Sequence, residues 1–289
     1  MMSVQQRKAA VIIPIYHPDD KFIELLDMLK RQSLRQISVL VIDSASDKKW
    51  QKHTDGLDIR IKDIDSRDFN HGGTRQMGVD MCPNKDIFIF MTQDAVLADE
   101  YAIENLVKVF DNEQVGCAYG RQLPHREANV FASFARLHNY PAESYIRSFE
   151  DRKKYGMKTA FLSDSFAAYR KSALEQVGGF PANVVLSEDM YVAAKMLMQG
   201  WKAAYAAEAR VYHSHNYSVW QEFKRYRDIG RFHGQEKWIR ETFGEAEGNG
   251  KRFVMEEARY LLEHDACLLW KMVVRDVTKF FGYKLGVLS

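Results

Sequence analysis

The chain has 289 residues, of which 41 are Lys or Arg and 39 are Asp or Glu, so its formal net charge is only +2. This length suits one large α/β domain with a helical appendage, and the balanced charge gives no signal of binding to nucleic acid. Three widely spaced cysteines exclude a disulfide framework, and no apolar run reaches the roughly 20 residues that a membrane-spanning helix needs.

Apolar runs alternate with helical patterns along most of the chain. The predicted strands cover residues 9–13, 37–42, 58–64, 87–91, 116–122, 160–169, 202–205 and 210–212. The predicted helices begin at Asp19 or Asp20, after Arg75, at Asp99, at Lys171 (ending on Gly178–Gly179) and at Glu188 after a Ser187 cap, and helix continues beyond Ser218. Residues 125–158 break the alternation. The pattern predicts an α/β fold with a mostly parallel sheet flanked by helices.

The segment Ile87–Met91 is the clearest strand, because five uncharged and mostly bulky residues predict burial on both faces. It ends on Thr92, Gln93 and Asp94, which are all polar. Ligands bind at the carboxyl ends of strands in open α/β sheets, so Asp94 is a candidate ligand for a divalent cation that holds a phosphate. The alternative is an acid that only caps the helix predicted from Asp99.

Two more polar clusters end predicted strands. Asp43 follows the second strand, and His213 and His215 follow the last one. Asp94, an imidazole and two diphosphate oxygens would form a suitable shell for Mn²⁺ or Mg²⁺. Asp43 could accept hydrogen bonds from a base or a ribose. The alternatives are histidines with a structural role and an Asx-turn at Asp43.

Two predicted helix starts carry polar side chains. Residues 70–75 contain two adjacent glycines, which permit close backbone approach, and a helix N-terminus favours anions. Glu188 and Asp189 occupy the first turn of a later helix, where acids also stabilise the helix dipole without any other role. Residues 70–75 are not a Walker loop, since no Gly-Lys-Ser/Thr follows.

Taken in order, these motifs resemble those of family 2 glycosyltransferases with the Rossmann-like GT-A fold. The resemblance spans about residues 9–216 and rests on Val11–Tyr16, Val41–Asp47, Thr92–Asp94, Gly178–Phe180, Glu188–Asp189 and His213. Residues 69–75 together with Thr92–Asp94 resemble the rhamnosyltransferase branch. The resemblance implies a GT-A domain at 1–216 and a C-terminal helical extension at 217–289 that contacts acceptor, membrane or a second copy.

The resemblance also implies roles for single residues. Asp189 matches the catalytic base, with Glu188 beside it. Asp94 and His213 match metal ligands, with His215 as the alternative imidazole. The residues expected to bind the nucleotide-sugar donor are Pro14, Tyr16, Asp43, Ser44, Arg75, Gln93 and Asp94. Thr92 departs from the family pattern, which usually has a second Asp there, so lower metal affinity is expected.

The implied activity is inverting, Mn²⁺- or Mg²⁺-dependent transfer of L-rhamnose from dTDP-L-rhamnose to a cell-surface polysaccharide or lipid-linked glycan. One alternative keeps this chemistry with a UDP-hexose donor such as UDP-glucose or UDP-galactose. Another is a non-catalytic nucleotide-sugar-binding scaffold. A nucleotidyltransferase is disfavoured, because residues 14–18 contain no glycine and no Lys or Arg.

The C-terminal residues predict an amphipathic helix. Its apolar positions are Leu262, Ala266, Leu269, Trp270, Val273, Val277, Phe280 and Phe281. Lys271, Arg275 and Lys279 lie four apart on a neighbouring face, which is typical of helices on anionic membranes. We therefore expect a cytoplasmic protein, peripheral on the inner face of the cell membrane. Packing on the catalytic domain or a homodimer interface is the alternative.

Overall fold

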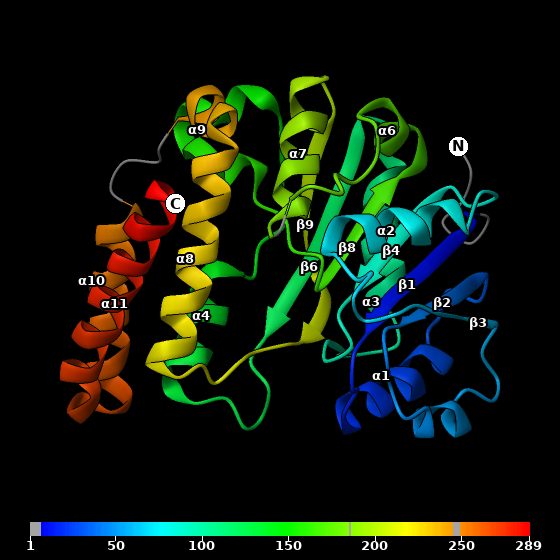
Figure 1. Cartoon of the computed structure of the whole chain (residues 1–289), viewed down its shortest axis with the longest axis horizontal. Helices are drawn as coiled ribbons and strands as arrows, with labels where there is room; N and C mark the ends of the chain where they lie inside the picture. Colours follow the sequence, from blue (N-terminus) through cyan, green and yellow to red (C-terminus); the bar gives the residue numbers. More distant parts are fainter. Residues whose placement is uncertain (1–6, 185, 245–248) are drawn as a thin grey trace.

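The computed structural model describes residues 7–184, 186–244 and 249–289, so the first six residues of the predicted GT-A domain lie outside it. Figure 1 shows a central sheet with helices on both faces and a separate group of helices beside it. The predicted boundary at 216/217 falls between the last strand, β9 (Lys202–Tyr212), and helix α8 (Val219–Gln235). No helix among the described residues has the length and apolarity needed to cross a bilayer.

The sheet has nine strands within the described residues, in the order β3-β2-β1-β4-β8-β6-β9-β5, and β7 pairs with β9. The strands other than β9 are β1 (Ala9–Ile15), β2 (Ile37–Asp43), β3 (Ile59–Asp63), β4 (Ile87–Met91), β5 (Val96–Leu97), β6 (Val115–Leu123), β7 (Tyr145–Arg147) and β8 (Phe166–Arg170).

Strand direction explains where polar residues gather. The pairs β1–β2, β2–β3, β1–β4 and β6–β9 are parallel, whereas β8 runs antiparallel to both β4 and β6. Strands β1, β2, β3, β4, β6 and β9 therefore all end at one edge of the sheet, and β8 begins there. The predicted α/β fold with a mostly parallel sheet is confirmed.

The structure differs from the predicted elements in three places. The strand predicted at 160–169 is only Phe166–Arg170, and residues 202–205 and 210–212 join into β9, whose pairing with β6 is irregular between Gly120 and Arg121. The aromatic segment 125–158 contains a helix, α4, and the short strand β7. A bulged strand interrupts the alternating pattern, so one long strand reads as two short ones.

The helices are α1 (Asp20–Lys30), α2 (His71–Asp80), α3 (Ala102–Lys108), α4 (Val130–Asn139), α5 (Arg152–Tyr155), α6 (Lys171–Gln176), α7 (Glu188–Met198), α8, α9 (Lys237–Phe243), α10 (Asn249–His264) and α11 (Leu269–Leu288).

Asp19 caps α1 by accepting a hydrogen bond from the Lys21 amide. Gly178 and Gly179 have φ of 84° and 75°, as a left-handed C-cap requires. The predicted side-chain cap at Ser187 is wrong: its φ is 66° and its hydroxyl makes no cap hydrogen bond.

Two apolar layers cover the sheet, and β4 contributes to both. Ile87, Ile89 and Met91 point into the layer that contains α1 and α3, whereas Phe88 and Phe90 point into the layer that contains α6 and α7. All five side chains are almost completely buried, which confirms the predicted central strand. Burial on both faces holds the end of β4 rigidly at the polar edge.

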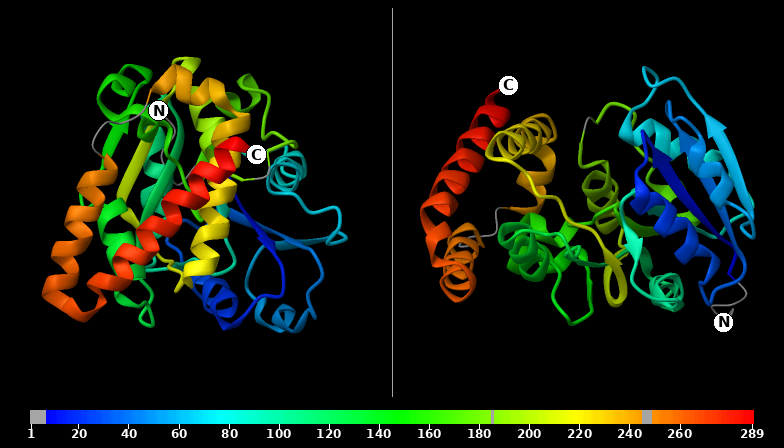
Figure 2. Two further views of the ribbon diagram at one scale, coloured as in Figure 1. Left: turned by 60° about the vertical axis from the view of Figure 1, so that its left-hand side comes forward. Right: turned by 90° about the horizontal axis from the view of Figure 1, so that it is seen from below.

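The helices α8, α10 and α11 form a layer beside the sheet, seen separately from it in Figure 2. Glycines let α8 and α11 approach closely, because a Cβ on Gly286 would lie 1.9 Å from the Arg227 carbonyl oxygen and one on Gly230 would lie 2.2 Å from that of Tyr283. A small apolar cluster of Phe131, Leu261 and Met272 joins this layer to α4. The otherwise irregular segment after β6 thus anchors the C-terminal helices.

The predicted basic face of α11 is wrong for two of its three residues. Arg275 is only 5 % exposed and pairs with Glu222 of α8 at 2.7 Å. Lys279 pairs with Asp276 at 3.0 Å. Only Lys271 points outward among the three. Both inner cations also face Glu222 of α8, Lys279 at 3.8 Å, and spacing within α11 does not reveal this acid of another helix.

Candidate active site

A cleft of about 670 Å³ opens at the edge where the parallel strands end. The sheet contributes Asp94, His213 and His215, and α7 contributes Glu188 and Asp189. The opposite wall comes from α4, α8, α10 and α11. Sequence segments more than 100 residues apart therefore meet in one cavity, as ligand sites at the carboxyl ends of strands require.

Three predicted metal ligands lie together in this cleft. Oδ2 of Asp94 lies 3.5 Å from Nε2 of His213 and 3.7 Å from Nδ1 of His215. The three ligand atoms all lie within 4.8 Å of one another. One carboxylate and two imidazoles can share a single divalent ion, with small side-chain movements and room for further oxygen ligands.

A hydrogen bond orients the His213 ring for this role. Nδ1 of His213 lies 2.9 Å from Oε1 of Gln122. That oxygen also accepts a hydrogen bond from Arg136, and the Gln122 amide nitrogen donates to Ser163 at 2.9 Å. Oε1 can only accept, so Nδ1 carries the proton and the Nε2 lone pair faces Asp94. Gln122 thus acts as an outer partner of the candidate metal site.

The pKa values of Asp94, His213 and His215 favour the protonation states that bind a cation. Burial lowers the pKa of His213 to about 3, so its ring is neutral near pH 7. Burial also lowers the pKa of His215. Burial alone would raise the pKa of Asp94, but the charges of the two histidines outweigh it and lower the pKa. A neutral imidazole and an ionised carboxylate are the ligating states.

A buried cation organises the acids beside the cluster. Nε of Arg75 lies 2.7 Å from Asp164, and its Nη1 lies 2.6 Å from Glu188. Arg75 and both acids are nearly inaccessible to solvent. Asp164 precedes β8 and also accepts a hydrogen bond from the Tyr169 hydroxyl at 2.6 Å. Arg75 lines the cleft, but these carboxylates already neutralise its charge, so a contact with donor diphosphate stays a prediction.

Asp189 differs from its neighbour Glu188, because no cation among the described residues pairs with it directly. Its Oδ1 accepts a hydrogen bond from the Met190 amide at 2.7 Å, and its Oδ2 accepts one from the Asp164 amide at 3.2 Å. Burial, together with the charges of Asp164 and Glu188, raises the pKa of Asp189 to about 8. A partly exposed carboxyl group with a raised pKa in a cleft suits a general base.

Arg75 and Asp94 line this cleft, but the other residues expected to bind the donor lie at the same sheet edge outside it: Pro14, Tyr16, Asp43, Ser44 and Gln93. Ile15 of β1 pairs directly with Asp43 of β2, and Gln93 exchanges two hydrogen bonds with the Tyr16 backbone, at 2.7 and 3.1 Å. The Ser44 hydroxyl donates to the Ile15 carbonyl at 2.9 Å. Pro14 and Tyr16 belong to the same β1 terminus. The ring of Tyr16 stays exposed and free to stack on a base.

Asp43 forms a local turn, but its side chain reaches the amide three residues on and not the one two residues on, as the predicted Asx-turn would. Its carboxylate accepts hydrogen bonds from the amide of Ser46, at 2.8 Å, and from the hydroxyl of the same residue. A carboxylate offers about four acceptor positions, so a base or ribose could still bind. The turn and the nucleotide contact are therefore compatible, and the nucleotide contact stays a prediction.

The glycines of residues 70–75 have a packing role. Asn70 caps α2 by accepting a hydrogen bond from the Gly73 amide at 2.6 Å. A Cβ on Gly72 would lie 1.8 Å from the Pro181 carbonyl oxygen. Glycine at position 72 therefore leaves space for the backbone that leads to α7. This close contact brings Arg75 of α2 to the acids near α7.

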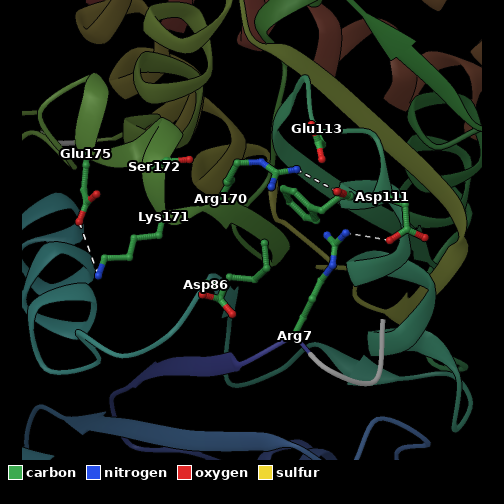
Figure 3. Close-up of a pocket in the computed structure, with 10 residues that line it drawn as sticks. Arg7, Asp86, Asp111, Glu113, Arg170, Lys171, Ser172 and Glu175 are labelled. Atoms are coloured by element: carbon green, nitrogen blue, oxygen red, sulfur yellow. Dashed lines mark hydrogen bonds and ion pairs between the residues drawn. The ribbon is translucent and has the colours of Figure 1, made fainter. Parts of the chain in front are cut away.

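A second hollow of about 490 Å³ lies at the opposite edge of the sheet, where β4 and β6 begin (Figure 3). Its charges pair with each other: Arg7 with Asp111 at 2.8 Å, and Lys171 with Glu175 at 3.7 Å. Because ligands of such sheets bind at the carboxyl ends of the strands, this hollow is not the candidate active site.

Two residues of the site were not predicted. Gln122 is the next-to-last residue of β6, so the strand-end argument that selected Asp94 could also have selected it. Arg136 comes from α4, inside the segment whose structure was not predicted, and no local pattern distinguishes it from a surface arginine.

Comparison with known sequences gives the same family throughout. A sequence model described as glycosyl transferase family 2 matches residues 10–178. The O-antigen chain rhamnosyltransferase RfbN of Salmonella typhimurium is 46 % identical over 280 residues, which cover 96 % of this chain and 89 % of that protein. The O-antigen chain rhamnosyltransferase WbaN of Salmonella anatum is 40 % identical over 277 residues, which cover 96 % and 88 %.

Solved structures share the fold at much lower identity. The mannosyltransferase PcManGT of Pyrobaculum calidifontis, solved with GDP-Man and Mn²⁺, has a TM-score of 0.67 and 17 % identity, covering 96 % of this chain and 87 % of that one. TarS of S. aureus, solved with UDP-GlcNAc, has a TM-score of 0.58 and 13 % identity, covering 98 % and 91 %.

Proposed function

The chain belongs to glycosyltransferase family 2, and on that basis we propose that it transfers L-rhamnose from dTDP-L-rhamnose to a growing O-antigen polysaccharide on a lipid carrier. The names of the two rhamnosyltransferases support the sugar and the class of acceptor. The observation that carries the proposal is the juxtaposition of Asp94, His213 and His215 with Asp189 in one cleft.

The donor extends along the carboxyl edge of the sheet. Its base and ribose lie over the ends of β1 and β2, near Tyr16 and Asp43, and its diphosphate lies at Asp94 and the two histidines. Asp94, His213 and His215 would hold a divalent ion, which when bound would neutralise the charge that develops on the leaving diphosphate. The mixed imidazole and carboxylate donor set favours Mn²⁺. PcManGT, which has the same fold, was solved with Mn²⁺.

The transfer inverts the anomeric carbon in one displacement. An acceptor hydroxyl oxygen forms the new bond to that carbon as the bond to the diphosphate breaks, and dTDP leaves from the opposite face. Asp189 takes the hydroxyl proton as the new bond forms. Arg75 holds Glu188 and Asp164 in place, so the carboxylate of Asp189 stays within reach of the acceptor.

Two alternatives remain testable. A UDP-hexose donor would use the same chemistry, because nothing among the described contacts selects the base. A non-catalytic scaffold would explain Thr92 in place of the usual acid, but it would not need a base with a raised pKa beside a candidate metal site. Hydrolysis of the donor in the absence of acceptor distinguishes a scaffold from an enzyme, because a scaffold would show none.

The direct test is a panel of dTDP-L-rhamnose, UDP-glucose, UDP-galactose and GDP-mannose with and without Mn²⁺. We expect dTDP-L-rhamnose with Mn²⁺ to raise the melting temperature most, because ligand at 100 times its Kd stabilises the folded state by about 2.7 kcal/mol. We also expect slow hydrolysis of that donor without acceptor. If only a UDP-hexose stabilises the protein, that sugar nucleotide and not dTDP-L-rhamnose is the donor. Binding without any hydrolysis would favour the non-catalytic scaffold.

We also propose that the outer face of α11 lies on an anionic membrane surface, where a lipid-linked acceptor would be found. Trp270 is 69 % exposed, and Phe280 and Phe281 are each 57 % exposed on the same helix. The exposed side chains of Lys271 and Lys284 accompany this apolar stripe. An apolar stripe with adjacent lysines is complementary to a membrane that carries acidic lipids.

Co-sedimentation with vesicles tests this surface. We expect the protein to pellet with vesicles that contain phosphatidylglycerol, and a Phe280→Asp/Phe281→Asp variant to remain in the supernatant with its donor binding intact. Ile146→Asp, at an exposed apolar position of β7, is the control that should still pellet. Pelleting of the double variant would contradict the proposal. If the wild type dimerises without vesicles and the double variant is monomeric, the apolar stripe belongs to a homodimer interface instead.

A further inference from the structure

The wall of the cleft that faces the sheet carries polar side chains outside the region matched by the family model. Glu222 and Tyr226 come from α8, Glu257 from α10 and Lys279 from α11. The family model ends at residue 178. Asp189, which also lies beyond residue 178, lines the same cavity, so these helices form the wall that faces it across the cleft.

Glu257 differs from Glu222 of the same wall, whose Oε2 also lacks a hydrogen-bond partner among the described residues but whose Oε1 pairs with Arg275. Glu257 is only 2 % exposed, and its Oε2 is buried without a hydrogen-bond partner among the described residues. The neighbouring cations are already paired, Arg275 with Glu222 at 2.7 Å and Lys279 with Asp276 at 3.0 Å. An unsatisfied buried polar group costs about 1–3 kcal/mol, so a folded protein retains one only where something else compensates.

We propose that Glu257 binds a hydroxyl group of the acceptor sugar, with Lys279 beside it, and so forms an acceptor subsite on the helical layer. This inference rests on the proposed function. A hydroxyl hydrogen would satisfy the free Oε2, whereas a phosphate would be repelled by the ionised form of the carboxyl group. A neutral pyranose, with several hydroxyls and no charge, is therefore the ligand class that fits.

The position of Glu257 in the fold indicates that the subsite binds the acceptor and not the donor. The candidate metal site that holds the donor diphosphate lies at the ends of β4 and β9. Figure 1 places α10 farther from β4 than α7 is, and Asp189 of α7 and Glu257 of α10 both line the cleft. An acceptor held by Glu257 would therefore share the cleft with the base Asp189.

The ionisation of Glu257 is compatible with this contact. Burial raises the pKa of Glu257 to about 7. Near neutral pH the empty subsite can thus hold a neutral carboxyl group, which avoids an isolated buried charge. Both the neutral and the ionised group can bond a hydroxyl.

The test separates acceptor binding from donor handling. p-Nitrophenyl glycosides of the common hexoses serve as acceptors, and the best of them is used with Glu257→Leu, Glu257→Gln and the exposed-site control Glu263→Leu. We expect Glu257→Leu to raise the acceptor KM about 10- to 100-fold, because a hydrogen bond to a charged group contributes about 1.5–3 kcal/mol. Glu257→Gln keeps a carbonyl acceptor and should recover part of the loss, and Glu263→Leu should match wild type.

Donor hydrolysis without acceptor should stay unchanged in all three variants. An unchanged acceptor KM in Glu257→Leu would overturn the inference, as would a parallel loss of donor hydrolysis, which indicates a purely structural role. Failure of every glycoside to accept sugar from a wild type that hydrolyses the donor would also count against a neutral-sugar subsite. A wild type that hydrolyses no donor contradicts the proposed function itself.

Discussion

Replacing Asp189 by asparagine is expected to lower the kcat of sugar transfer by about 10²–10⁴-fold, the usual contribution of a positioned general base. The substitution preserves the shape of the side chain and the start of α7. Its oxygen can still accept the Met190 amide hydrogen bond, but the amide group cannot take a proton from the acceptor. Initial rates of dTDP release with and without acceptor measure the effect.

Donor affinity should barely change in this variant, because Asp189 does not hold the nucleotide. Titration calorimetry with dTDP-L-rhamnose and Mn²⁺ checks this and also reports loss of local structure. The two other acids near the base serve as comparisons: Asp164→Asn and Glu188→Gln. If Asp189→Asn turns over normally while one of these is inactive, the base is misassigned. If all three remain active, the inverting mechanism is refuted.

The pH dependence of the wild type provides a second measurement of the same base. The base must be deprotonated to act, and burial together with nearby acids raises the pKa of Asp189 to about 8. Activity should therefore fall as the pH drops below about 8 and reach a plateau above it. The residual activity of Asp189→Asn should lack this rise.

Replacing Asp94 by alanine is expected to abolish metal-dependent donor binding. Loss of an outer partner of a metal site typically costs about 10–100-fold in affinity, so loss of the only carboxylate in the described cluster should cost more than about 100-fold. Without that carboxylate the two histidines hold the ion poorly, and the diphosphate charge is not neutralised. Donor binding measured over a Mn²⁺ titration reports this loss directly.

The variant Gln122→Ala should weaken the same candidate metal site to a smaller extent. It leaves all three candidate ligands in place but removes the hydrogen bond that orients His213, so the Mn²⁺ requirement should rise by about 10–100-fold without loss of maximal activity. His213→Asn and His215→Asn then show how each histidine contributes. Full wild-type activity in EDTA, or normal donor binding by Asp94→Ala, would contradict the metal site.

The fold class was predictable because local patterns report local burial. Residues 87–91 form an unbroken apolar run because both faces of β4 are covered, and the glycines at 178–179 indicate a left-handed helix end. Asp94 and His213 were predictable for a related reason. A polar residue that directly follows a buried strand must lie at the sheet edge, whatever the rest of the chain does.

Side-chain partners were not predictable, because they depend on which elements the topology brings together. The antiparallel insertion of β8 between β4 and β6 is what places Asp164 at the same edge as Asp94. Arg75, expected to meet the donor, is enclosed by Asp164 and Glu188. Periodicity along α2 contains no information about either acid.

The C-terminal helices mark this division most clearly. Spacing along the chain was enough to predict a helical apolar face over residues 262–281, but the structure divides it between α10, which ends at His264, and α11, which begins at Leu269. Contacts between helices determine that Arg275 and Lys279 point inward to Glu222 of α8 while Trp270 and Phe280 remain outside. The close glycine contacts between α8 and α11 set the rotation of the helix, and they depend on two segments about 50 residues apart meeting in space.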